Sequence, residues 1–163
     1  MVDDAILLAR ARAAVAAVED PEIPVLTIED LGILRDIRLA GAVVEVTITP
    51  TYSGCPAMAV ITWEIEGALA RAGFTEFRVR SVLSPAWTTD WLSAEGRRKL
   101  LDYGIAPPAR AAGRRGLFTT ERLACPRCGG EDTELLSEFG STACKSLHRC
   151  LTCREPFDAF KCH

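Results

Sequence analysis

Apolar and polar positions at the start of the chain follow a helical period. Over residues 4–18, apolar side chains recur at intervals of three or four, and an aspartate stands just before them as a cap. We expect this helix to end before residues 20–24, because the prolines of that segment impose extended backbone. Residues 27–30 then resemble a capping box for a single helical turn that Gly32 closes.

Two segments with the period of a β-strand follow. Residues 33–39 are apolar with charges interspersed, and over 44–48 valine and isoleucine alternate with glutamate and threonine. A second helix is predicted to begin at Pro56 and to run to about residue 72, because proline suits the first helical position. Residues 77–83 are interpreted as a third strand, and residues 90–102 as a short helix that follows a loop.

This order of elements predicts an α+β fold, a small two-layer α/β sandwich over residues 1–105. Residues 106–116 are rich in proline, glycine, alanine and arginine and have no periodicity, so we interpret them as a linker. Residues 117–163 form a separate cysteine-rich unit. The sequence therefore predicts two domains joined by a short connection.

Composition narrows the class of protein. The chain is 48% hydrophobic and 25% charged, which is typical of a soluble globular protein, and its net charge of −3 does not indicate a nucleic-acid partner. The arginines of 110–122 lack interleaved aromatic residues, so we interpret them as solvated. No apolar stretch is long enough to span a membrane, and the acidic N-terminus is unlike a secretory signal. We expect a cytoplasmic protein in which cysteines are metal ligands or reactive thiols.

The strongest chemical signal is a pair of Cys-x-x-Cys motifs separated by twenty-one residues, formed by Cys125, Cys128, Cys150 and Cys153. Two residues between cysteines allow both thiolates to reach one ion, and two such turns complete a closed tetrahedral site. The spacer is long enough for a β-hairpin, so we expect a zinc-ribbon-like unit. A closed four-sulfur zinc site is structural, and it therefore leaves the activity of the protein unexplained.

Cys55 is the first of three further cysteines. It lies between the second strand and the helix that begins at Pro56, where the helix dipole and free amides favour a thiolate. We interpret it as a candidate nucleophile or soft-metal ligand, and the alternative is a small buried residue that only packs.

Cys144 and Cys162 lie near the second motif, together with His148 and the C-terminal His163. Cys144 and Cys162 are candidates for a transient metal or cluster contact. The ending 160–163 could supply soft ligands to a second metal or a variant ligand to the zinc, and a frayed tail is the alternative. Both histidines fall in this unit, without a recognisable nucleophile motif or a glycine-rich nucleotide loop in the chain. A standalone enzyme is therefore not predicted.

Several motifs resemble known families. The segments 20–24, 28–33, 47–56 and 84–91 are similar to the small domain of iron–sulfur cluster assembly factors, the SufT-like, MIP-type group. The C-terminal motifs around the two Cys-x-x-Cys pairs, with Phe139-Gly140-Ser141-Thr142 and Phe160-Lys161-Cys162-His163, resemble the D-subunit family of the bacterial phenylacetyl-CoA epoxidase system.

This resemblance implies an accessory role in the aerobic breakdown of phenylacetate. The system is a multicomponent monooxygenase with a di-iron oxygenase core and an iron–sulfur reductase, and it epoxidises the ring of phenylacetyl-CoA. The resemblance implies that the D protein helps to insert iron or an iron–sulfur centre into its partner subunits, the reductase above all. It also implies that Cys55 is the functional thiol.

A non-catalytic adaptor that bridges oxygenase and reductase is the competing hypothesis. Under it, Trp87 and Trp91 would be exposed interface anchors, although ordinary core packing is the simpler interpretation of both.

Overall fold

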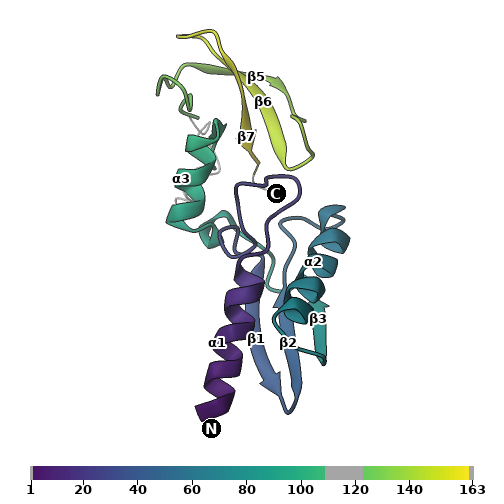
Figure 1. The fold of residues 1–163 in the computed structure, drawn as a ribbon. Helices are drawn as coiled ribbons and strands as arrows, with labels where there is room; N and C mark the ends of the chain where they lie inside the picture. The colour runs from purple at the N-terminus through teal and green to yellow at the C-terminus, as the bar shows by residue number, and fades with distance from the viewer. Residues whose placement is uncertain (1, 109–122, 162–163) are drawn as a thin grey trace. The chain divides into compact units, whose positions relative to one another are not determined.

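The computed structural model describes residues 2–108 and 123–161, and these fall into two compact units, Met1–Trp87 and Thr88–His163. The first unit contains helices α1 (Val2–Ala16) and α2 (Ala57–Arg71) and strands β1 (Leu34–Ala40), β2 (Val43–Ile48) and β3 (Phe77–Ser81) (Figure 1). The predicted mixed α/β architecture is confirmed, and each predicted element of this unit lies within a few residues of its expected position.

The sheet of the first unit has the order β1-β2-β3. Strands β1 and β2 form an antiparallel hairpin, whereas β3 returns parallel to β2 because α2 provides the crossover between them. The helices α1 and α2 pack against each other, α1 also against β1 and α2 against β3, which gives two layers.

The core lies between these two layers. The alternation predicted for β2 is observed, since Val44, Val46 and Ile48 are fully buried while the residues between them are partly exposed. Helix α2 contributes Ile61 and Ile65 at helical spacing, both also fully buried. Burial of a leucine or isoleucine side chain contributes about 1.5–3 kcal/mol, so these positions fix the helix on the sheet.

The loop between α1 and β1 is held by its own polar side chains. The Asp20 Oδ1 atom accepts hydrogen bonds from the backbone N–H groups of Glu22 (2.8 Å) and Ile23 (2.9 Å). The predicted capping box is present and reciprocal: Thr27 Oγ1 accepts from Asp30 N, and Asp30 Oδ2 accepts from Thr27 N, each at 3.1 Å. The acidic motif of this segment therefore shapes the loop.

The second unit contains a 3₁₀ turn (Thr89–Trp91), helix α3 (Ala94–Asp102) and strands β4 (Ile105–Ala106), β5 (Thr133–Ser137), β6 (Lys145–Cys150) and β7 (Pro156–Phe160). The strand order is β4-β7-β6-β5. Its buried cluster is small and includes two of the cysteines; the members are Ala106, Cys125, Cys150, Phe157 and Ala159.

The structure divides the chain earlier than the boundary predicted at residue 105. Residues 88–108 belong with the C-terminal unit because β4 pairs in parallel with β7 and α3 packs on β4. The Arg97 guanidinium also donates to the backbone carbonyls of Thr89 and Pro108, which ties the ends of this segment together. Pairing with a strand fifty residues away leaves no local signal in the sequence. Residues 109–116 of the predicted linker lie outside the described residues.

Within residues 2–108 and 123–161, none of the helices has the length and apolar character needed to cross a membrane.

Replacing Ile65 by alanine should lower the free energy of unfolding of the first unit by about 3 kcal/mol, because the cavity forms in a closely packed core. Trp63 lies on the same helix but is 67% exposed, so Trp63→Ala is the matched control, with an expected change below about 0.5 kcal/mol. Urea unfolding followed by circular dichroism measures both; equal losses would contradict the assigned packing of α2.

Candidate metal centre and thiol site

The four cysteines of the paired motifs converge in the second unit. All four Sγ atoms lie within 4.8 Å of one another, with Cys125 and Cys153 at 3.8 Å and Cys128 and Cys150 at 3.6 Å. Sulfur atoms 2.3 Å from a tetrahedral zinc ion are about 3.8 Å apart, so this donor set fits zinc. The predicted ligands are therefore brought together with the spacing that the ion requires.

Backbone geometry at the two motifs is equivalent. In each, the amide four residues after the first cysteine donates to that cysteine's carbonyl at 2.9 Å: Gly129 to Cys125, and Arg154 to Cys150. Both donors have a left-handed backbone, φ 73° at Gly129 and 68° at Arg154. Arg154 is the less favourable residue there, because a side chain in this region costs about 1 kcal/mol relative to glycine. The conformation of the second turn is therefore maintained by the structure around it and not by the backbone preference of Arg154.

Backbone amides also point at the sulfur atoms. Gly130 N lies 3.4 Å from Cys128 Sγ, and Cys153 N lies 3.5 Å from Cys150 Sγ. The hydrogen bond from Cys153 N is the largest of several influences that together lower the pKa of the Cys150 thiol to about 6. A backbone hydrogen bond from Glu155 lowers the pKa of Cys153, but burial and the three neighbouring sulfur atoms together outweigh it and raise that pKa to about 12. A thiolate is the form that binds zinc, so these amides favour metal binding. A zinc ion held here would cross-link the two turns and, with four sulfur ligands, leave no position open for substrate.

Cys55 lies in the first unit, in the loop that leads from β2 to α2, as the sequence predicted. Gly54 before it has φ 83°, and a Cβ atom at Gly54 would touch nothing within 4 Å. Glycine is required here for its backbone conformation, and space remains open on the outer side of the loop. The Cys55 side chain is partly exposed.

The charge environment of Cys55 differs from the expected one. Burial raises the pKa of the Cys55 thiol, and the carboxylates of Glu22 and Asp20 raise it further. The backbone amide of Ala57 and the hydroxyl of Tyr52 act in the opposite direction and lower the pKa of the thiol, but they do not outweigh burial. The expectation of an acidic thiol is therefore wrong, because desolvation and two carboxylates are not visible from the position at a helix start alone.

The structure thus places the segment 20–24 near Cys55, although more than thirty residues separate them. Thr49, at the start of the same loop, is 1% exposed, and its hydroxyl has no hydrogen-bond partner among the described residues. An unsatisfied buried hydroxyl costs free energy. Sequence reasoning interpreted Asp20 and Glu22 as capping residues and did not connect them to the cysteine.

Cys144 does not join the metal centre. It precedes β6 and Cys150 ends β6, so about 20 Å of extended chain separates the two. Its side chain is buried, its Sγ lies 3.0 Å from Thr142 Oγ1, and its carbonyl accepts from Lys161 N at 2.9 Å. Cys144 is therefore not part of the four-cysteine cluster.

The His148 side chain contacts residues other than the four clustered cysteines. Its Nε2 atom lies 2.9 Å from Ser146 Oγ, its ring stacks on Phe157, and burial lowers its pKa. Cys162 and His163 lie outside the described residues.

The two tryptophans considered as exposed interface anchors under the adaptor hypothesis are not fully exposed in the structure. Trp87 is 6% exposed and its Nε1 donates to the Leu31 carbonyl at 2.7 Å, and Trp91 is partly buried. Trp63 on α2, which sequence reasoning did not single out, is 67% exposed. The apolar residues of α2 recur at helical spacing, and this pattern predicts a helix packed in the core without showing that Trp63 is exposed.

Two family models match the chain. Residues 8–82 match a model described as an iron–sulfur cluster assembly protein, and residues 109–161 match one described as a PaaD zinc beta ribbon domain. A protein of Escherichia coli (strain K12), named as the D-subunit of a "Putative 1,2-phenylacetyl-CoA epoxidase", is 49% identical over 150 residues, which cover 92% of this chain and 90% of that protein. The chain belongs to the phenylacetyl-CoA epoxidase D-subunit family.

Among solved structures, a domain of unknown function (DUF59) from Bacillus anthracis has a TM-score of 0.56 and 24% identity, covering 61% of this chain and 95% of that one. This likeness shows the fold alone. The two family models leave residues 83–108 unmatched. That segment contains β4, which pairs with β7 in the sheet of the ribbon, and α3, which packs on β4.

Removing the metal should unfold the second unit and leave the first intact. The buried cluster of the ribbon is too small to support it, whereas the first unit has a core of its own. Cys125→Ser should abolish zinc retention, measured by elemental analysis, and should remove hydrogen-exchange protection from the second unit, β4–β7 and α3, while the first unit keeps its protection. Cys55→Ser is the control and should keep the zinc. Loss of zinc from that variant, or protection of β5–β7 without metal, would contradict the assignment.

Glu22→Gln should accelerate alkylation of Cys55 by iodoacetamide at pH 7 by about threefold, because it removes a charge that raises the pKa of the thiol. Removal of the Glu22 charge favours the thiolate, and the thiolate is the reactive form. Glu29→Gln is the control, because the Glu29 carboxylate pairs with Arg12 at 2.8 Å. Mass spectrometry of the modified peptide gives the rate, and equal rates in the two variants would contradict the charge environment.

Proposed function

We propose that this protein is an accessory factor of a phenylacetyl-CoA epoxidase, and that it assists the insertion of iron or an iron–sulfur centre into partner subunits. It is not proposed to catalyse the epoxidation itself. The relative named as the D-subunit of this epoxidase, similar over nearly the whole chain, connects the protein with that system. The iron–sulfur assembly model over residues 8–82 supports the maturation role.

The observation that carries the proposal is the setting of Cys55. Its thiol is partly exposed, lies in an open loop and shares its surroundings with Asp20 and Glu22. Thiolate is a good ligand for iron in clusters, and nearby carboxylates attract the cation. Iron is the cargo here, and it passes to the partner.

The raised pKa of Cys55 suits a transient contact. At neutral pH the free thiol stays protonated, so metal binding must displace a proton and the affinity falls as the pH is lowered. Displacing this proton costs free energy, so the complex between Cys55 and iron is weaker and the iron is released more readily. The Ala57 amide and the Tyr52 hydroxyl stabilise the thiolate once it has formed.

Zinc in the second unit has a different role under this proposal. Its four ligands are the cysteines of the paired motifs, and the closed site builds the ribbon. Cys144 and Cys162 remain candidates for a further contact with iron; the burial of Cys144 ranks it below Cys55.

An adaptor that bridges the oxygenase core and the iron–sulfur reductase is the second candidate. Trp63 favours it, because an exposed tryptophan on a helix is frequent at protein interfaces. In that case Cys55 has no part in the function.

Cys55→Ser separates the two candidates. Under the maturation role, the variant keeps its fold and zinc, while the reductase or oxygenase co-produced with it loses most of its iron and activity. Iron and acid-labile sulfide in the purified partners measure this directly. Ser53→Ala in the same loop is the matched control, because it alters an exposed side chain and leaves the thiol in place. Partners that are fully metallated beside Cys55→Ser would favour the adaptor.

A further inference from the structure

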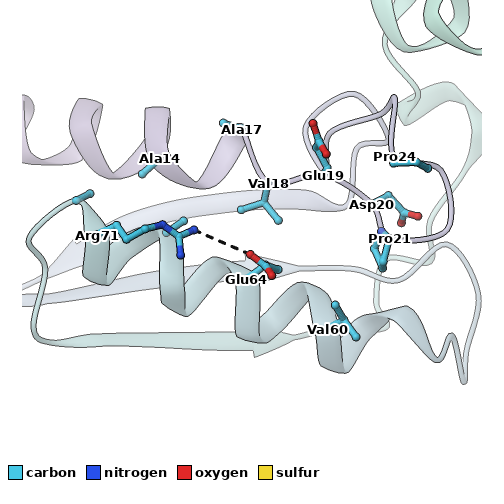
Figure 2. A pocket seen from close by; sticks show the side chains of 12 residues that line it. Ala14, Ala17, Val18, Glu19, Asp20, Pro21, Pro24, Val60, Glu64 and Arg71 are labelled. Carbon is cyan, nitrogen blue, oxygen red and sulfur yellow. Dashed lines mark ion pairs between the residues drawn. The ribbon is translucent and has the colours of Figure 1, made fainter.

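The first unit contains a groove of 660 Å³ between α1 and α2 (Figure 2). Its apolar lining is made largely of small side chains from the two helices and the residues just after them, Ala14, Ala17, Val18, Ala68 and Ala72. Alanines on both sides leave room for a bulky side chain of a ligand, and their apolar surface favours burial of such a group. The groove can therefore accommodate a bulky apolar side chain of a ligand.

Charge in the groove is unevenly distributed. Glu19 and Asp20 line the end formed by the loop after α1, and Glu64 and Arg71 come from α2. Arg71 is the one basic residue among the described lining residues, and its guanidinium is 4.0 Å from the Glu64 carboxylate, as Figure 2 shows. The loop end of the groove is therefore acidic, and the end near Arg71 is close to neutral.

The acidic end is shared with the surroundings of Cys55. Asp20 lines the groove and is also one of the carboxylates that act on the Cys55 thiol. A molecule lying in the groove would extend toward the loop that carries the cysteine. On the outer face of α2, Val60 and Trp63 are 44% and 67% exposed, and Val60 also lines the groove. Exposed apolar groups beside a groove are typical of protein interaction sites.

We propose that this groove binds a segment of a partner protein that presents a bulky apolar side chain next to a lysine or arginine. The apolar side chain occupies the space above the alanines, and the cation pairs with the carboxylates at the loop end. This inference rests on the proposed function, in that the segment belongs to the subunit that receives the metal. Docking then holds the acceptor site beside Cys55.

A second copy of this chain fits the groove less well. The described groove lining carries three carboxylates, Glu19, Asp20 and Glu64, against one arginine, so pairing two such grooves would bring like charges together. A basic segment of another protein has the complementary charge and gains from the same carboxylates.

Binding of the zinc-loaded, full-length chain to purified reductase and oxygenase subunits, measured by titration calorimetry, tests the proposal. Glu19→Lys and Ala17→Phe should each weaken binding by at least about tenfold, since the first reverses a charge at the loop end and the second fills the groove. Ala13→Phe on α1 and Glu66→Lys on α2 do not alter the groove lining, and should stay within about twofold of wild type. Zinc content and unfolding free energy verify that the variants are folded.

Photocrosslinking identifies the occupant. Benzoylphenylalanine in place of Trp63, an exposed aromatic residue beside the groove, should crosslink a partner peptide that contains a large apolar residue beside a lysine or arginine. Crosslinks to an acidic segment or to a second copy of this chain would overturn the proposal. Equal weakening by groove and control variants, or failure of both subunits to bind the wild-type chain, would also overturn it.

The outcome separates this inference from the maturation role. Groove variants that bind normally, while Cys55→Ser still leaves the partner without iron, would disprove the groove and leave the function intact. Weak binding by the groove variants, with full metallation beside Cys55→Ser, would support the docking site and disprove the maturation role.

Discussion

The convergence of four thiols is the constraint on which the second unit depends. Strands β5–β7 form a narrow sheet over a buried cluster of a few side chains, and two of those side chains are themselves cysteines. A core of this size does not offset the conformational entropy of ordering the chain, so a cross-link must supply the rest. Folding of this unit and binding of its metal are then one process.

The first unit is stabilised in a different way. Alternating residues of β2 and the inner face of α2 meet in a continuous apolar core, and the loop after α1 is closed by Asp20 and the Thr27–Asp30 cap. A rigid loop at this place serves the thiol site, because it fixes the carboxylates that surround Cys55. Asp20 thus has two effects: it holds the loop through hydrogen bonds, and, together with burial and Glu22, its charge raises the pKa of Cys55.

The pKa values of Cys150 and Cys55 shift in opposite directions because the two thiols have different surroundings. The Cys150 sulfur receives amide hydrogen bonds that favour the thiolate, which suits a permanent ligand. Burial and the neighbouring carboxylates raise the pKa of the Cys55 thiol, which suits the transient metal contact proposed for it. Backbone hydrogen bonds and nearby charges thus give the same functional group two different proton affinities.

Local patterns of the sequence determined most of the fold and the metal ligands. The period of β2, the proline at the start of α2 and the two Cys-x-x-Cys turns act within a few residues, so they can be recognised without tertiary information. Only the tertiary structure decided that α3 and β4 join the ribbon, that Asp20 and Glu22 act on Cys55, that Cys144 stays away from the metal and that Trp63 is exposed. Each of these depends on contacts between distant segments or on burial, and desolvation and long-range pairing have no signature in local spacing.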